Sequence, residues 1–174
     1  ELAHTLGLDP QFSRLDVSAH PMSFWLGDSR ITTRYGKTLW DPLSSTAHEV
    51  GHALYELGVD RNLPGPLANT NSLVLHESQS RLWENHVVHG KPFLTYFVPH
   101  MNKAYGTDYA LDDVYATVNM VQPSLIRVEA DEVTYPMHVI LRFELEKQLI
   151  RGELSVDDLP AAWNKRMQEL LGIA

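Results

Sequence analysis

The 174-residue sequence contains no cysteine, and this absence excludes disulfide bonds and metal sites built from thiolates. Apolar residues never run for eighteen positions, so we expect no membrane span. Basic residues are scarce, with 14 Lys and Arg against 22 Asp and Glu, for a formal net charge of −8. Because a nucleic-acid surface needs clustered Lys and Arg, we expect no nucleic-acid partner. No basic segment followed by an apolar one opens the chain, so we expect no secretory signal and a cytoplasmic protein.

The composition that remains is that of a soluble globular protein. Apolar residues make up 44% of the sequence and charged residues 21%. A chain of this length can bury one sizeable core, so we expect residues 1–174 to form a single domain. Nine histidines are more than is usual for this length. Because histidine is the commonest neutral metal ligand, their positions are the first place to look for chemistry.

The apolar pattern predicts a mainly α-helical protein with a small β element near residues 15–35. That region has no helical period and contains β-rich stretches at 15–18 and 30–35, which predict short strands. Asp41 followed by Pro42 indicates a helix start, and Gly58 is expected to end this helix in a left-handed conformation. Further helices are predicted over residues 71–89, 92–105, 111–121, 124–151 and 155–171.

Prolines and a capping pattern qualify the later helices. Pro99 is expected to bend or break its helix, and Pro136 to kink or split the one that Ser124 begins, because an internal proline removes a backbone hydrogen bond. In the last helix, Ser155 and the acid three residues later resemble a capping box, and Gly172 is the expected stop.

Residues 48–52 read HEVGH and are the first chemical signal. Two histidines four residues apart on a helix, here His48 and His52, project from one face and can bind the same ion. Glu49 sits beside the first of them, where it can take a proton from a water held by the ion. Zinc brings the pKa of such a water toward neutrality, so hydroxide becomes available at pH 7. Ordinary core or surface histidines can produce the same pattern, so a third ligand has to be found.

The third ligand should come from another element, because a catalytic zinc takes three protein ligands and keeps a fourth position open. Glu77 lies 25 positions after His52, on the next predicted helix. An antiparallel pair of helices would bring Glu77 opposite His52. His76 is the alternative, since adjacent helical residues point about 100° apart and cannot easily face one ion together. The spacing leaves this choice open, and a solvated surface carboxylate is the ordinary fate of a helical Glu.

Two arginines are candidates for substrate binding. A peptidase that cuts at a chain end must bind the terminal charge, and an arginine fork binds a carboxylate in bidentate fashion. Arg127 lies in an acidic segment, and Arg30 lies in a predicted strand. Each arginine also has a plain structural alternative, which is to pair with a nearby acid such as Asp28 or Glu129.

Four segments together resemble the Taq-type metallocarboxypeptidases, a family of zinc carboxypeptidases. The matching segments are 28–35 (DSRITTRY), 48–56 (HEVGHALYE), 76–85 (HESQSRLWEN) and 126–135 (IRVEADEVTY). They occur in the family's order, and the similarity runs from about Leu15 to Gly172. The resemblance implies a zincin-type helical metallopeptidase core in a homodimeric enzyme that removes single residues from peptide C-termini.

The resemblance also implies roles for individual residues. His48 and His52 match the family's zinc ligands, and Glu77 matches the third ligand in preference to His76. Glu49 matches the general base and acid.

Two further matches and one departure follow from the same comparison. Arg127 matches a residue implicated in substrate binding, and Arg30 lies in the Asp-x-Arg-x-Thr motif. Family members are longer, with helical regions before and after this one, and their later Gln-Asp-x-His-Trp motif does not occur here. We therefore expect residues 1–174 to be a partial catalytic core.

The sequence thus predicts a zinc metallocarboxypeptidase that acts on peptides with a free C-terminus. Cobalt is an alternative metal, because imidazole and carboxylate ligands do not strongly distinguish it from zinc. The rival interpretation is a catalytically incomplete zinc-binding piece that serves as a scaffold or assembly module and self-associates through exposed apolar surface. An endopeptidase or aminopeptidase with the same zinc geometry is a third interpretation, which the reaction products would distinguish.

Overall fold

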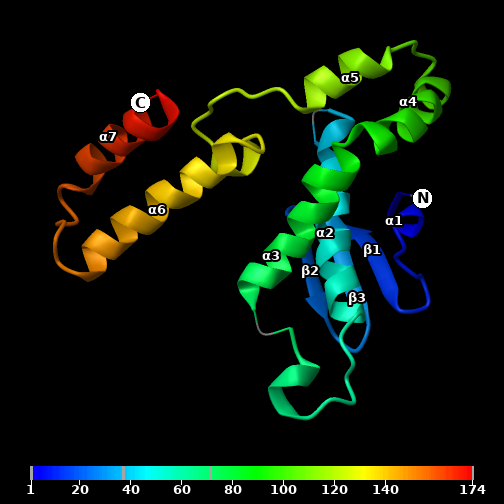
Figure 1. Ribbon diagram of the computed structural model, residues 1–174, viewed down its shortest axis with the longest axis horizontal. Helices are drawn as coiled ribbons and strands as arrows, with labels where there is room; N and C mark the ends of the chain where they lie inside the picture. Colours follow the sequence, from blue (N-terminus) through cyan, green and yellow to red (C-terminus); the bar gives the residue numbers. More distant parts are fainter. Residues whose placement is uncertain (1, 37, 71, 174) are drawn as a thin grey trace. The chain divides into compact units, whose positions relative to one another are not determined.

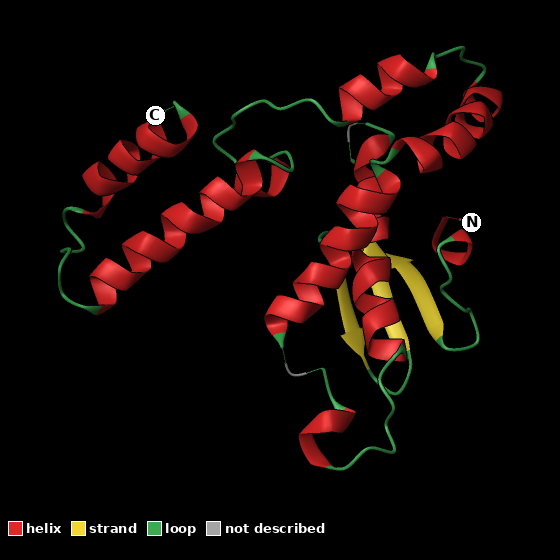
Figure 2. Ribbon diagram, viewed as in Figure 1, coloured by secondary structure: helices red, strands yellow, loops and turns green. Residues whose placement is uncertain are grey.

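The computed structural model describes residues 2–36, 38–70 and 72–173 (Figure 1). The chain separates into two compact units, Glu1–Val118 and Asn119–Ala174. The first unit holds a small sheet and five of the helices, and the second holds two more helices (Figure 2). The prediction of a mainly α-helical protein with a small β element near residues 15–35 is therefore confirmed. The expectation that residues 1–174 form one domain stays a prediction.

Three short strands form the sheet: β1 (Ser13–Val17), β2 (Met22–Trp25) and β3 (Ser29–Thr33). β3 lies in the middle, parallel to β1 and antiparallel to β2. Its alternate residues Ser29, Ile31 and Thr33 are buried, as expected of a strand with one face on a core. The sequence predicts strands only near the positions of β1 and β3. β2 (Met22–Trp25) was not predicted.

Helix α2 (Trp40–Leu57) packs against the sheet in the first unit (Figure 1). The predicted start at Asp41 and Pro42 is two residues late, because α2 begins at Trp40, and Asp41 lies in the first helical turn instead of capping the helix. The Asp41 carboxylate accepts hydrogen bonds from the backbone N–H and the hydroxyl of Thr38 (3.1 and 2.8 Å). The predicted left-handed end at Gly58 is wrong. Its φ is −75°, because the chain continues in a right-handed turn in which the Gly58 N–H donates to the Leu54 carbonyl (2.9 Å).

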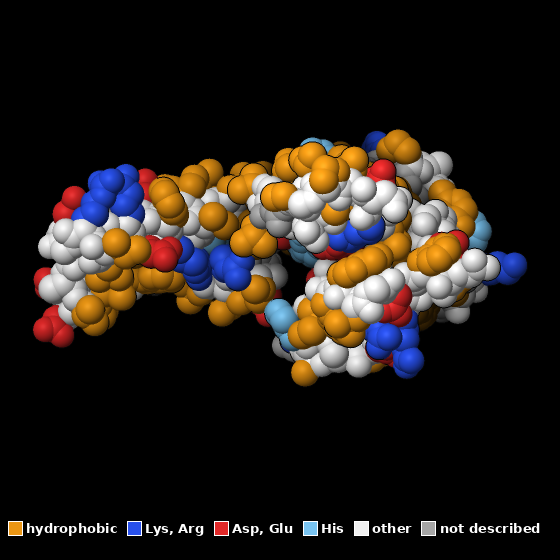
Figure 3. Space-filling view, turned by 90° about the horizontal axis from the view of Figure 1, so that it is seen from below, with side chains coloured by type: hydrophobic (Ala, Val, Ile, Leu, Met, Phe, Trp, Pro, Cys, Tyr) orange, Lys and Arg blue, Asp and Glu red, His pale blue; other side chains and the backbone are white. Residues whose placement is uncertain are grey.

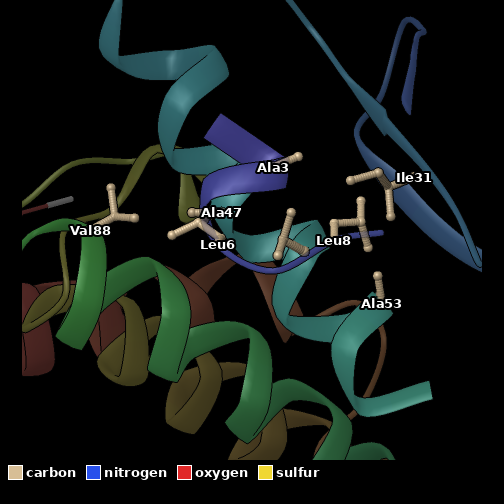
Figure 4. Close-up of a cluster of buried hydrophobic side chains, with 8 residues drawn as sticks. Ala3, Leu6, Leu8, Ile31, Ala47, Ala53 and Val88 are labelled. Carbon is tan, nitrogen blue, oxygen red and sulfur yellow. The ribbon is translucent and has the colours of Figure 1, made fainter. Parts of the chain in front are cut away.

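The main core of the first unit lies between α2, β3 and the N-terminal helix α1 (Leu2–Thr5) (Figure 4). Its buried members are Ala3, Leu6, Leu8, Ile31, Ala47, Val50, Ala53 and Val88. α2 contributes its apolar face to this core. Burial of small and branched side chains on that face stabilises both the helix and its contact with β3. This packing holds α2 in place for the polar residues on its other faces.

Helix α3 (Leu73–Arg81) runs directly into a π-helical segment, Leu82–Val88. The hydroxyl of Ser72 caps its start by accepting the N–H of Leu75 (3.3 Å). These elements correspond to the helix predicted over 71–89, although residue 71 lies outside the described residues. A 3-10 helix, Gly65–Ala68, occupies the loop between α2 and α3. Single π-helical turns occur frequently at functional sites, which draws attention to the side chains of Leu82–Val88.

Helices α4 (Lys91–Tyr105) and α5 (Leu111–Val118) complete the first unit. α4 continues through Pro99, so the helix is not broken there, and the alternative expectation of a bend stays a prediction. Leu94, Val98 and Met101 are buried in one cluster before and after the proline. Their packing holds the backbone helical in spite of the hydrogen bond that proline cannot donate.

The second unit contains a 3-10 helix (Arg127–Glu129), α6 (Thr134–Ile150) and α7 (Leu159–Leu171). α6 begins ten residues later than the predicted start at Ser124. The Asp131 carboxylate accepts hydrogen bonds from the backbone N–H groups of Val133 and Thr134 (both 2.9 Å). These bonds satisfy N–H groups at the start of α6, so the helix begins here. This start places Pro136 in the first helical turn, where a missing N–H is tolerated, and the prediction of a helix split there is wrong.

Helices α6 and α7 pack on each other through Leu141, Leu145, Met167 and Leu171, which are buried. The capping pattern before α7 is present, since the backbone N–H of Asp158 donates to the Ser155 hydroxyl (3.1 Å), but the helix begins only after it. Gly172 ends α7 with a φ of 70°, which confirms the predicted left-handed stop.

None of the helices in the described ranges is long and apolar enough to cross a membrane.

Candidate metal centre

The site is built where α2 and α3 pack side by side with opposite chain directions (Figure 1). Gly51 allows the two backbones to touch. A Cβ on Gly51 would stand 2.6 Å from the carbonyl oxygen of Gln79 and 2.6 Å from Cα of Ser80, so only glycine fits. Because of this close approach, Glu77 lies over the histidine-bearing face of α2. The antiparallel pairing that the sequence predicts is thereby confirmed.

His48, His52 and Glu77 converge on one point. Oε2 of Glu77 lies 3.7 Å from Nε2 of His48 and 3.4 Å from Nε2 of His52. The two imidazole rings have centroids 4.9 Å apart and stand nearly perpendicular to each other, at 80°. One ligand atom from each of the three residues lies within 4.8 Å of the other two. The hydrogen bond that Nε2 of His52 donates when it carries a proton outweighs burial and lowers the pKa of Glu77 to about 2, so this carboxylate is ionised at neutral pH.

This arrangement fits a divalent metal ion. Zinc bonds of about 2.0–2.2 Å place tetrahedral ligand atoms roughly 3.3–3.6 Å apart. The distances from Glu77 to the two histidines, 3.7 and 3.4 Å, are close to this spacing. Two imidazoles and one carboxylate are also a donor set found in catalytic zinc sites, where a fourth position stays open. The three residues can therefore hold a metal ion.

Glu49 lies beside this group on α2 and is buried, with 6% of its surface exposed. Burial raises the pKa of the Glu49 carboxyl, while the charges of His48 and His52 act against the rise. His20, in the connection between β1 and β2, acts in the same direction as these two histidines. Glu49 is thus a carboxyl with an increased affinity for a proton next to a potential metal site.

His76 is turned away from the point where the other three residues meet. Its Nδ1 lies 2.8 Å from Nδ1 of His52, on the side of that ring remote from Glu77. Its Nε2 lies 2.9 Å from Oε1 of Glu56, one turn after His52 on α2. The structure therefore places Glu77 with the two histidines, and His76 behind one of them.

Glu84 contacts His48 in a comparable position. The Nδ1–H of His48 donates to Oε2 of Glu84 (2.8 Å), leaving Nε2 to face Glu77. Ser44 donates to the other carboxylate oxygen of Glu84 (2.8 Å), and Arg81 donates to Oε2 (3.0 Å). Burial opposes a charge on His48, but the hydrogen bond to Glu84 together with the nearby carboxylate charges outweighs it and raises the pKa of this histidine.

Glu56 and Glu84 were not singled out by sequence reasoning, although helical spacing points to both. Glu56 follows His52 by four residues, so the two share a face of α2. Glu84 follows Glu77 by seven residues, which is two helical turns along the same face. Carboxylates at these positions are visible in the sequence, but their partners become evident only when the two helices are packed together.

The two arginines have structural partners. Arg30, on β3, donates through Nε to Asp28 (3.0 Å). Arg127 lies in the second unit, where it donates to the hydroxyl of Tyr135 (2.6 Å) and stacks its guanidinium over the same ring at 5.4 Å. The predicted contacts of Arg30 and Arg127 with a substrate stay predictions.

Known proteins resemble the chain over its whole length. A family model described as carboxypeptidase Taq (M32) metallopeptidase matches residues 1–174. Thermostable carboxypeptidase 1 of Thermus thermophilus is 46% identical over 180 residues, covering 100% of this chain and 35% of that protein. Carboxypeptidase 1 of Bacillus subtilis is 43% identical over 175 residues, covering 97% of this chain and 35% of that protein.

Solved structures agree with the sequence comparison. The crystal structure of an M32 carboxypeptidase from Deinococcus radiodurans R1 matches with a TM-score of 0.92 and 41% identity, over 99% of this chain and 36% of that one. The chain thus spans about a third of the length of the relatives it matches. On this evidence, and on the histidine and glutamate group that its helices assemble, the chain belongs to the carboxypeptidase Taq (M32) family of metallopeptidases.

Proposed function

We propose that this chain carries the metal site of a zinc metallocarboxypeptidase that removes single residues from peptide C-termini. The observation that carries the proposal is the convergence of His48, His52 and Glu77 within 4.8 Å, beside the buried Glu49. Family membership supports the reaction class, because the matched relatives are carboxypeptidases. Since the chain spans 35% of such a relative, the activity of the whole protein is part of the proposal.

In this proposal His48, His52 and Glu77 hold the metal ion. When bound, zinc would polarise the scissile carbonyl and lower the pKa of the attacking water. Co²⁺ suits the same donors, because imidazole and carboxylate ligands do not strongly distinguish the two metals. Glu77 brings a negative charge to the site at neutral pH, since its pKa is about 2.

Glu49 is the proposed general base and acid. Its carboxylate takes the proton of the attacking water and later delivers it to the leaving amine. Burial raises the pKa of Glu49, and this increased proton affinity suits a group that must both accept and release a proton. General acid–base catalysis of this kind typically contributes about 10²–10⁴-fold to a rate.

Arg127 is the proposed partner of the substrate's terminal carboxylate, and Arg30 is the other candidate for substrate binding. An arginine fork binds a carboxylate through two parallel hydrogen bonds. Tyr135 supports this role, because its hydroxyl and its ring both contact Arg127 and restrict the guanidinium to one direction. The substrates are therefore peptides with a free C-terminus.

The test is a mass-spectrometric assay of the zinc-loaded chain with an N-terminally blocked peptide. We expect stepwise loss of C-terminal residues, with no loss for Glu49→Gln, which keeps the size of the side chain and removes its basicity. Turnover by Glu49→Gln at the parent rate would contradict the role of Glu49. Internal cleavage would indicate an endopeptidase, and shortening of an unblocked peptide from its N-terminus would indicate an aminopeptidase.

The second candidate is a zinc-binding scaffold or assembly module without activity of its own. Large apolar side chains at the surface favour it (Figure 3), among them Leu73, Val74 and Ile150, which are 83, 79 and 79% exposed. Zinc bound at one ion per chain, no hydrolysis and a mass that grows with protein concentration would support this function. The same mass measurement tests the homodimer that we propose for the enzyme. We propose the cytoplasm as its location.

A further inference from the structure

Two side chains behind His52 continue a line of hydrogen bonds away from the metal centre. Nδ1 of His52 lies 2.8 Å from Nδ1 of His76, and Nε2 of His76 lies 2.9 Å from Oε1 of Glu56. The three side chains are 15, 17 and 14% exposed. At these distances and this burial each polar atom depends on its protein partner, so the partners decide where the protons lie.

The inventory of donors and acceptors allows one order of protons when Nε2 of His52 is to be a metal ligand. An ionised carboxylate only accepts, so Glu56 requires a proton on Nε2 of His76. Neutral His76 then has its lone pair on Nδ1 and accepts the proton of Nδ1 of His52. The lone pair of His52 is consequently on Nε2, the atom that faces Glu77 at 3.4 Å.

Glu56 is itself held in place from the loop between α2 and α3. Arg61 donates to its Oε2 (2.6 Å) and to its backbone carbonyl (2.9 Å), and the hydroxyl of Thr70 donates to its Oε1. The Arg61 guanidinium also lies over the ring of Trp25 on β2, 4.5 Å from its centroid. These contacts leave the Glu56 carboxylate one orientation, with Oε1 directed at His76.

The other histidine of the site reaches the same protonation by a shorter route. Glu84 accepts the Nδ1–H of His48 directly, at 2.8 Å. For His52 the carboxylate stands one side chain further away, and His76 fills the space between them. Because a histidine accepts at one ring nitrogen and donates at the other, His76 links the carboxylate of Glu56 to His52 and keeps the proton of His52 on Nδ1.

We propose that His76 and Glu56 are positioning residues that hold His52 in the tautomer and ring orientation needed for metal binding. The inference rests on the proposed role of His52 as a ligand. It gives His76 a task that uses both of its nitrogens and requires no contact with the metal. Loss of such an outer partner typically costs about 10–100-fold in metal affinity.

The first test measures zinc affinity of the 174-residue chain by competition with a chelator. We expect His76→Leu to weaken binding by about 10–100-fold, because His52 loses its acceptor. His76→Asn should retain more affinity than His76→Leu, since an amide oxygen can replace Nδ1 as acceptor. The control is His86→Leu, which removes an exposed histidine and should leave the affinity unchanged. A zinc affinity of His76→Leu equal to that of the parent overturns the proposal.

The line of hydrogen bonds from Glu56 through His76 to His52 is called the relay below. A double-mutant cycle separates this relay from independent effects of the two polar residues Glu56 and His76. Because Glu56 acts on His52 only through His76, the variant with Glu56→Leu and His76→Leu together should bind zinc no more weakly than His76→Leu alone. Two losses that multiply would show that Glu56 acts by another route and would overturn the relay.

Nitrogen-15 spectra of the histidine rings in the zinc-loaded parent test the proton positions without any substitution. We expect protons on Nδ1 of His52 and on Nε2 of His76, and a proton on Nδ1 of His76 would overturn the proposal. This measurement decides the question even if His76→Leu fails to fold. Failure of the parent to bind zinc would instead refute the metal site itself, whereas tight binding by both parent and variants would refute only the relay.

Discussion

Cα of Ser80 lies 2.6 Å from the point where a Cβ on Gly51 would stand, so α2 and α3 touch backbone to backbone beside the metal centre. This contact sets the height of Glu77 above the two histidines of α2. The size of the side chain at position 51 therefore decides how closely α3 approaches α2, and with it the geometry of the site.

Gly51→Ala is expected to destabilise the chain and to weaken zinc binding. Helix propensity alone would favour alanine by about 1 kcal/mol, but forcing a methyl group into a filled contact typically costs about 1–3 kcal/mol or more and moves α3 away. Urea unfolding and chelator competition measure the two effects. Gly58→Ala is the matched control, because Gly58 has a φ of −75° and a Cβ there would meet only the carbonyls of its own helix, at 3.2 and 3.6 Å. Increased stability of Gly51→Ala would contradict the contact.

Glu84→Gln is expected to lower zinc affinity about tenfold. The neutral amide can still accept from Nδ1 of His48, but it no longer favours the tautomer by charge, and one of its donors must face Arg81 or Ser44. Competition with a chelator measures the change. Glu146→Gln removes the same charge from an exposed position and should bind zinc like the parent. Equal affinity of the two variants would exclude an effect of Glu84 on His48.

Pro99→Ala is expected to stabilise the first unit by about 1–2 kcal/mol. Pro99 is exposed within α4 and cannot donate a backbone hydrogen bond, whereas alanine restores the donor and has the highest helix propensity. The gain is smaller than the full cost of an internal proline, because proline also restricts the unfolded chain. Pro136→Ala is the control, since a proline in the first turn of α6 interrupts no hydrogen bond. Urea unfolding monitored by circular dichroism compares the two; equal effects would contradict this interpretation.

Asp131→Ala is expected to destabilise the second unit by about 1–2 kcal/mol at pH 7. Burial acts to raise the pKa of Asp131, but hydrogen bonds from the backbone of Thr134 and Gln122 outweigh it, so the pKa lies below its ordinary value. The contribution of the carboxylate is therefore complete above the unfolded pKa, about 3.9, and is lost as the pH falls through the lower folded value. The difference between parent and variant should shrink below about pH 4. Asp157→Ala, at an exposed position, should show neither effect.

The sequence predicts most of the helices but not all of their limits. Its errors at Gly58 and Ser124, and the break that it allows at Pro99, have a common cause, which is that each was judged from the preference of a single residue. At Pro99 the buried neighbours Leu94, Val98 and Met101 outweigh the proline, and at Ser124 the hydrogen bonds of Asp131 select a later start. At Gly58 the backbone hydrogen bond to Leu54 keeps the turn right-handed. Hydrogen bonds and packing, and not the preference of the single residue, decided the outcome each time.

The sequence alone determined that His48 and His52 share one face of a helix with Glu49 beside them, because helical geometry is local and repeats every 3.6 residues. Residue spacing left open whether His76 or Glu77 faces the histidines. The tertiary structure decided this through the close packing at Gly51, which fixes both the separation and the rotation of α3 against α2. The partners behind the two histidines also depend on this packing, because contacts between helices are set by how two surfaces fit and not by the order of residues within either one.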